Sequence, residues 1–104
     1  MKPSNLLPID SLHDDWCDKD EIMLHACFQL LVDCIEKENL FEGATDFTQD
    51  DEHEAAKLEL QTLYEWWGMR KHKDQSIHSL STRQYDLDSE MLIRLIAHRR
   101  WLWT

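Results

Sequence analysis

Glycine and proline are scarce in this sequence, with two of each among 104 residues. An all-β fold needs many tight turns, and these two residues usually supply them. The apolar residues instead recur at spacings of three and four, which is the pattern of a helix that buries one face. The sequence therefore predicts an all-α fold, and its length fits one domain.

Three segments carry this helical pattern. We expect helices over about Asp20–Glu38, from Thr48 to about Arg70, and from Asp86 or Asp88 to the C-terminal residues. Asp18 or Asp20 can cap the first helix, and Thr48 with Asp51 has the spacing of a capping box. The expected core side chains are Leu24, Cys27, Phe28, Leu31, Cys34 and Ile35, widened by Met23 and Leu30, then Ala56, Leu60, Leu63, Tyr64 and Trp67, and finally Met91, Leu92, Leu95, Ile96 and Leu102.

The connecting segments complete the predicted architecture. Residues 1–17 contain Pro3 and Pro8 and are expected to form an extended arm, with residues 18–104 as a single helical domain. The loop over residues 39–47 is expected to tuck Leu40, Phe41 and Phe47 under the core, and residues 71–85 to form a polar surface loop. The prediction is a three-helix antiparallel bundle with an extended N-terminal arm.

The net charge of −10 is unevenly spread along the chain. Residues 1–56 contain fifteen Asp and Glu against three Lys, whereas residues 57–104 contain six acids against eight bases. Phosphate binding depends on Lys and Arg, so an acidic half of this kind argues against direct contact with nucleic acid or an anionic membrane. It favours a basic protein surface as partner, although charge that only keeps the protein soluble explains the same pattern.

The sequence offers little support for catalysis or metal binding. His25 and Cys27 point about 200° apart on a helix, and His53-Glu54 is followed by Lys57 where a zinc-binding HExxH motif requires its second His. Cys27 and Cys34 lie on the apolar stripe, where burial raises a thiol pKa and lowers its reactivity. We therefore expect no enzyme activity, no cofactor and no metal.

Two other groups of side chains could bind a ligand or partner. Arg94, Arg99 and Arg100 form a basic patch on the last helix, which can contact an anion or pair internally with the acidic half. Trp66 and Trp67 point about 100° apart, so a core position for Trp67 leaves Trp66 at the edge. Trp66 is then either an interface residue or covered by the N-terminal arm, and Trp101 is a further candidate.

Three segments and the C-terminus carry a resemblance. Residues 30–38 (LLVDCIEKE), 63–67 (LYEWW), 90–96 (EMLIRLI) and the final Leu102-Trp103-Thr104 resemble a group of small uncharacterised tailed-bacteriophage proteins, over roughly residues 20–104. The resemblance implies action inside a bacterial host. It brings no activity or site residue with it.

These observations lead to one expected function and two alternatives. The first is a cytoplasmic interaction protein that inhibits or modulates a host defence or nucleic-acid-handling enzyme, for example as an anti-CRISPR-like or DNA-mimicking inhibitor, with a homo-oligomer as a further option. The expected partner-binding residues are Asp14, Asp15, Asp50, Asp51, Glu52, Glu54, Trp66 and Trp101. The alternatives are a binder of an anionic small molecule such as a nucleotide, through Lys71, Arg94, Arg99 and Arg100, and a virion assembly factor.

The expected location rests on what the N-terminus lacks. Met1–Asp10 has no apolar run of signal-peptide length, and the longest apolar stretch, near Ala26–Val32, is too short to cross a bilayer. Three cysteines, an odd number, fit reduced thiols inside a cell.

Overall fold

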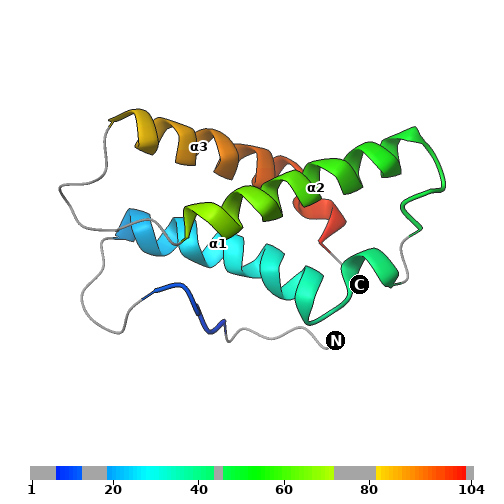
Figure 1. Cartoon of the computed structure of the whole chain (residues 1–104), viewed down its shortest axis with the longest axis horizontal. Helices are drawn as coiled ribbons and strands as arrows, with labels where there is room; N and C mark the ends of the chain where they lie inside the picture. The colour runs from blue at the N-terminus through cyan, green and yellow to red at the C-terminus, as the bar shows by residue number, and fades with distance from the viewer. Residues whose placement is uncertain (1–6, 13–18, 44–45, 72–81, 103–104) are drawn as a thin grey trace.

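The computed structural model describes residues 7–12, 19–43, 46–71 and 82–102. This part of the chain forms three helices, α1 (Lys19–Glu36), α2 (Asp51–Arg70) and α3 (Thr82–Ala97), and two short 3₁₀ turns, η1 (Leu40–Glu42) and η2 (Arg99–Trp101). α1 and α3 run in one direction and α2 runs in the other (Figure 1). No strand occurs among these residues, and the predicted all-α three-helix antiparallel bundle is confirmed.

Residues 7–12, the described part of the predicted arm, are not helical and lie along α1. The backbone N–H of Asp10 donates to Oε1 of Gln29 at 3.2 Å, and Oγ of Ser11 lies 2.6 Å from Nδ1 of His25. Gln29 and His25 are both buried polar residues of α1, so these contacts satisfy polar groups that would otherwise lose water. Asp14 and Asp15 lie outside the described residues.

α1 places its predicted stripe against the other helices. Leu24, Phe28, Leu31 and Cys34 are buried, and Cys27 and Ile35 are partly buried. The backbone N–H groups of residues 37 and 38 both donate to the carbonyl of Asp33, and Asn39 then adopts a left-handed conformation at φ 52°, so the helix ends at Glu36 rather than Glu38. The prediction that Met23 and Leu30 widen the buried stripe is wrong, because both side chains are exposed.

The loop after α1 packs its apolar residues as predicted. Leu40 and Phe47 are buried, and Phe41 packs edge-on against Phe47 with ring centroids 5.5 Å apart.

α2 begins at Asp51, three residues later than predicted. The carboxylate of Asp50 accepts from the backbone N–H of His53 at 2.8 Å, so Asp50 is the N-cap. The backbone N–H and the hydroxyl of Thr48 both donate to the carboxylate of Asp46, which removes Thr48 from the proposed capping box. Local side-chain bonding therefore decides between two capping residues.

α2 ends at Arg70, as predicted, and Arg70 itself is buried. Its guanidinium donates from Nε and Nη2 to the two carboxylate oxygens of Asp88, each at 2.8 Å. This ion pair joins α2 to α3 inside the bundle.

α3 begins at Thr82, four residues before Asp86 and six before Asp88. Residues 82–85 are thus helical rather than part of the predicted loop, while residues 72–81 lie outside the described residues. Asp88 does not cap the helix, because its carboxylate is buried against Arg70 and also accepts from Gln84 at 2.8 Å. Met91 and Leu95 are buried as predicted, Ile96 is exposed, and α3 ends at Ala97, before Leu102.

Aromatic rings fill the centre of the bundle between α1 and α2. Trp67 is buried and stacks on Phe28 at a centroid distance of 4.8 Å and an interplanar angle of 17°. The ring of His25 meets Trp67 edge-on at 4.7 Å. Trp66 is half-buried and packs against Phe28 at 5.4 Å, which confirms its predicted place at the edge of the core.

Candidate partner-binding site

The start of α2 and the turn before it form a strongly acidic segment, residues 46–54. It contains five Asp and Glu and no Lys or Arg. Asp46, Asp50, Asp51, Glu52 and Glu54 are all exposed. Anionic side chains stabilise the positive end of a helix dipole, so part of this charge has a structural role. Asp51 and Glu54 make no side-chain cap, and their carboxylates face solvent.

Trp101 lies beside this acidic segment because α2 and α3 are antiparallel. The indole is half-buried and packs edge-on against His53 at 4.8 Å and near Phe47 at 6.3 Å. The guanidinium of Arg100 lies 4.8 Å from the indole centroid. The turn η2 thus brings an aromatic side chain into contact with the first turn of α2.

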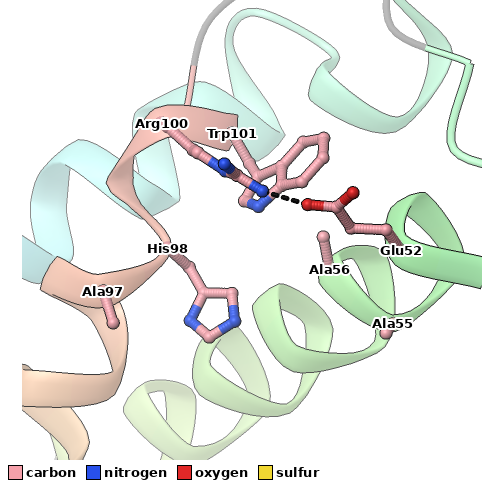
Figure 2. A pocket seen from close by; sticks show the side chains of 7 residues that line it. All are labelled: Glu52, Ala55, Ala56, Ala97, His98, Arg100 and Trp101. Carbon is pink, nitrogen blue, oxygen red and sulfur yellow. Dashed lines mark hydrogen bonds and ion pairs between the residues drawn. The ribbon is translucent and has the colours of Figure 1, made fainter.

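A shallow cleft of about 220 Å³ opens between α2 and the end of α3. It is lined by Glu52, Ala55, Ala56, Ala97, His98, Arg100 and Trp101. Figure 2 shows Glu52 reaching across its mouth to Arg100, with Trp101 behind this pair and His98 on the α3 side. Ala55, Ala56 and Ala97 contribute only methyl groups to this lining.

The ion pair between Glu52 and Arg100 at this cleft is exposed to solvent. The two side chains are 64% and 67% exposed. Exposed pairs of this kind contribute between zero and about 1 kcal/mol, because water screens them and both side chains lose rotamer freedom. A cation from a partner can therefore replace Arg100 at Glu52 at little cost.

The structure brings together five of the eight predicted partner-binding residues. Asp50, Asp51, Glu52, Glu54 and Trp101 share one end of the bundle. Trp66 does not join them, since it lies 14 residues after Glu52 on α2, about 21 Å along the helix. The positions of the other two, Asp14 and Asp15, are not described.

The predicted anion-binding cations are not gathered at one place. Arg94 donates from Nε to Glu59 at 2.8 Å and Arg100 pairs with Glu52, so both are neutralised by carboxylates of α2. Lys71 follows the opposite end of α2, about 28 Å along the helix axis from Glu52. Internal pairing of Arg94 and Arg100 is thus observed, although only Glu52 belongs to the acidic half.

A second polar cluster links the arm to α1 and was not anticipated from the sequence. Ser11, His25 and Glu21 form a series of hydroxyl, imidazole and carboxylate, with 3.6 Å between Nε2 of His25 and Oε2 of Glu21. Such a series can activate a nucleophile. Here the imidazole is fully buried against Trp67, whereas a general acid–base must reach the leaving group. The cluster acts as a polar anchor for the arm.

The thiols of α1 are held in their unreactive form. Burial, with a smaller contribution from the charge of Glu38, raises the pKa of Cys34 to about 11, and burial also raises the pKa of Cys27. We expect iodoacetamide at pH 8 to alkylate Cys34 far more slowly in the folded protein than in urea, because the thiolate is the reactive form. Mass spectrometry of the labelled peptides measures this. Equal rates in both states would contradict a buried Cys34.

The carboxylates near this end of the bundle link stability to pH. Hydrogen bonds from the backbone and ring of His53 lower the pKa of Asp50, and a hydrogen bond from Arg94 lowers that of Glu59. A carboxylate with a lowered folded-state pKa stabilises the fold above its unfolded pKa, and this stability is lost as pH falls through the folded pKa. We therefore expect the melting temperature to fall as the pH decreases from about 5 to about 3.

The double variant Asp50→Asn/Glu59→Gln tests this source of the pH dependence. Asn still caps a helix and Gln keeps the size of Glu, but neither titrates. The fall in melting temperature with decreasing pH is expected to be shallower in this variant. An unchanged slope would assign the acid sensitivity to other carboxylates.

Within the described residues, no group of three or more His, Cys, Asp or Glu is placed to hold a metal ion, and no helix is long and apolar enough to cross a membrane. Compared with protein-family models, with curated proteins and with solved structures, the chain matches none of them. Its function is therefore inferred from its own residues.

Proposed function

We propose that the protein is a non-catalytic interaction protein that binds a basic surface of another protein through residues 46–54 and Trp101. The observation that carries this proposal is the placement of exposed carboxylates beside a half-buried indole and a cleft. Tryptophan is enriched at the anchoring positions of protein interfaces, and complementary charge guides the approach of the partner.

We propose a protein of a bacterial host as the partner, on the resemblance to small phage proteins that the sequence leads us to expect. Surfaces that bind nucleic acid use Lys and Arg to contact its phosphates, and the carboxylates of residues 46–54 would take the place of these phosphates. We propose a host enzyme of defence or nucleic-acid metabolism as the partner, with the complex forming in the host cytoplasm and the protein acting as its inhibitor or modulator.

A matched pair of charge reversals tests this surface. Asp51→Lys/Glu54→Lys alters two exposed carboxylates of the acidic segment and leaves the Asp50 cap intact. Glu65→Lys/Glu90→Lys makes the same change in net charge at exposed positions elsewhere on α2 and α3. Immobilised wild-type protein and the control are expected to retain the same basic protein from bacterial lysate, and Asp51→Lys/Glu54→Lys to lose at least about 90% of it, a tenfold change.

Salt provides an independent measurement on the same complex. Between ionic strengths of about 0.01 and 0.15 M the Debye length falls from about 30 to 8 Å, so electrostatic association is expected to weaken. Retention that is indifferent to both salt and the Asp51/Glu54 reversal would refute binding through the acidic segment. Recovery of the protein from purified phage particles would instead favour a virion assembly factor.

A further inference from the structure

The side of the bundle formed by α1 and α3 carries a second surface, which is apolar. Five large side chains on it are 45–66% exposed. They are Met23 and Leu30 on α1, and Tyr85, Ile93 and Ile96 on α3. We call these five residues the α1–α3 face. A monomer that exposes several large apolar side chains together usually uses them for an interaction.

Helical periodicity places these residues on one side of each helix. Met23 and Leu30 are seven residues apart, so they lie on the same side of α1, two turns from each other. Tyr85 and Ile96 are eleven residues apart, about three turns along α3, so they lie on the same side of it. Ile93 lies about 60° from Ile96 around the helix axis. By contrast, the exposed Leu58 and Met69 lie on α2, outside this face.

α1 and α3 pack against each other and run in the same direction (Figure 1), so the two strips lie on neighbouring parallel helices. The lining of a hollow of about 180 Å³ shows which residues of the two helices are level. It is lined from α1 by Asp20, Met23 and Leu24, and from α3 by Tyr85, Ser89 and Leu92. The start of one strip is thus level with the start of the other. Leu30 and Ile96, each seven residues after Met23 and Ser89, are then also level.

Charges at the start of the two strips are opposite in sign. Lys19 lies one turn before Met23 on α1, and Asp86 lies two turns before Ile93 on α3; both are exposed. Lys37 lies 18 residues, five full turns, after Lys19, on the same side of α1 but just past its other end. The α1 strip therefore starts at Lys19, with the exposed Asp20 beside it, and ends near Lys37, which pairs with Asp33 at 3.2 Å, whereas the α3 strip has an anion at its start.

We propose that the α1–α3 face binds the same face of a second copy of this chain, around a two-fold axis parallel to the helices. This axis lays α1 of each copy over α3 of the other in the same direction. Lys19 then meets Asp86 of the second copy, and Leu30 meets the region of Ile96. A perpendicular two-fold would instead lay α1 on α1 and bring Lys19 near Lys37 of the second copy. Lys37 already pairs with Asp33 of its own helix at 3.2 Å, so Lys19 would gain no anionic partner in that arrangement.

The expected dimer is weak and reversible. Specific interfaces bury about 1,200–2,000 Å² in total, and a face of five large apolar side chains per copy is expected to lie at the small end of that range. The two copies also repel each other through their net charge of −10 each. Self-association is therefore expected to strengthen as salt screens this repulsion, which is opposite in sign to the salt dependence of binding to a basic partner.

Sedimentation equilibrium of the full chain over a range of concentrations tests the dimer. The wild-type mass is expected to rise from that of one chain, 12.5 kDa, towards twice that value. Ile93→Glu places a charge in the interface and is expected to weaken the dimer at least about tenfold. Met69→Glu is the matched control, because Met69 is 71% exposed and Ile93 is 66% exposed. It is expected to leave the dimer unchanged.

A charge exchange tests the proposed axis. Asp86→Lys places a second cation opposite Lys19 and is expected to weaken the dimer several-fold, while Lys19→Glu/Asp86→Lys restores it. A chain that stays monomeric at all concentrations, or a dimer that Met69→Glu weakens as much as Ile93→Glu, would overturn the proposal. Asp51→Lys/Glu54→Lys is expected to leave the dimer intact, so the two proposed surfaces can fail independently.

Discussion

Replacing Arg70 with Met is expected to lower the free energy of unfolding by about 3–5 kcal/mol, the usual cost of breaking a buried ion pair by removing one partner. Arg70 is 1% exposed, and its guanidinium contacts both oxygens of Asp88. Without it, the carboxylate of Asp88 stays buried with only the amide of Gln84 as a hydrogen-bond donor among the described residues. That loss is a large fraction of the stability of a domain of this size.

Urea unfolding followed by circular dichroism measures the free energy of unfolding of Arg70→Met, and two further variants serve as controls. Arg100→Met removes the exposed partner of Glu52 and is expected to cost less than about 1 kcal/mol. Arg70→Met/Asp88→Leu replaces the buried charges together and is expected to be more stable than Arg70→Met alone, because no unpaired charge remains. If the double variant is less stable than Arg70→Met, the unpaired carboxylate of Asp88 is not the cause of the stability lost in Arg70→Met.

The geometry of Arg70 gives a reason to expect that recovery. Its third nitrogen, Nη1, is buried and has no hydrogen-bond partner among the described residues. A buried donor without a partner loses its hydration without compensation. The pair therefore fixes how α2 and α3 pack while contributing little net stability over an apolar replacement.

The sequence contains a pattern that indicates this ion pair. The pattern is missed when Arg70 and Asp88 are interpreted only as charges at the ends of helices. Asp88 lies three residues before Met91, which lies four before Leu95. Likewise, Trp67 lies four residues after Leu63, and Arg70 lies three after Trp67. Each charged residue continues the buried stripe of its helix. A charge in the register of a core stripe indicates a buried pair, whereas a cap or helix-end cation lies outside that register.

Periodicity predicted the three helices and most of the core, because one buried face is what the 3–4 spacing encodes. It did not separate the core from the α1–α3 face. Met23 and Leu30 lie beside the core stripe of α1. Side chains at these positions are buried only when another helix covers that side of α1. Which side of α1 remains open depends on where α2 and α3 pack, and that is a property of the whole bundle.

The candidate partner-binding site was predictable only in its components. Acidic residues at 50–54 and an aromatic residue at 101 are visible in the sequence, but their contact depends on antiparallel packing of α2 against α3 and on the turn η2. The N-cap of α2 shows the same limit. Thr48 and Asp50 are both good N-caps, and the carboxylate of Asp46, which binds Thr48, decides between them.

Replacing Trp67 with Ala is expected to cost about 3–5 kcal/mol, the range for removing a large buried aromatic side chain. Trp67 joins α1 to α2 through its stack on Phe28 and its edge contact with His25. The cavity left behind borders His25, whose hydrogen bond to Ser11 holds the arm. We therefore expect the arm near residues 7–12 to become susceptible to proteolysis in the variant.

The adjacent Trp66 provides the matched control, because it is also a tryptophan of α2 but is half-buried, whereas Trp67 is buried. Trp66→Ala is expected to cost clearly less, because the side chain is half-buried; its aromatic contacts among the described residues are with Phe28 and Trp67. Trp67→Phe keeps an aromatic ring in the stack and is expected to retain part of the stability if the alanine variant does not fold. Urea unfolding measures both losses of stability. Equal losses for Trp66→Ala and Trp67→Ala would contradict the larger contribution expected of the buried Trp67, and would mean that both indoles hold α1 against α2.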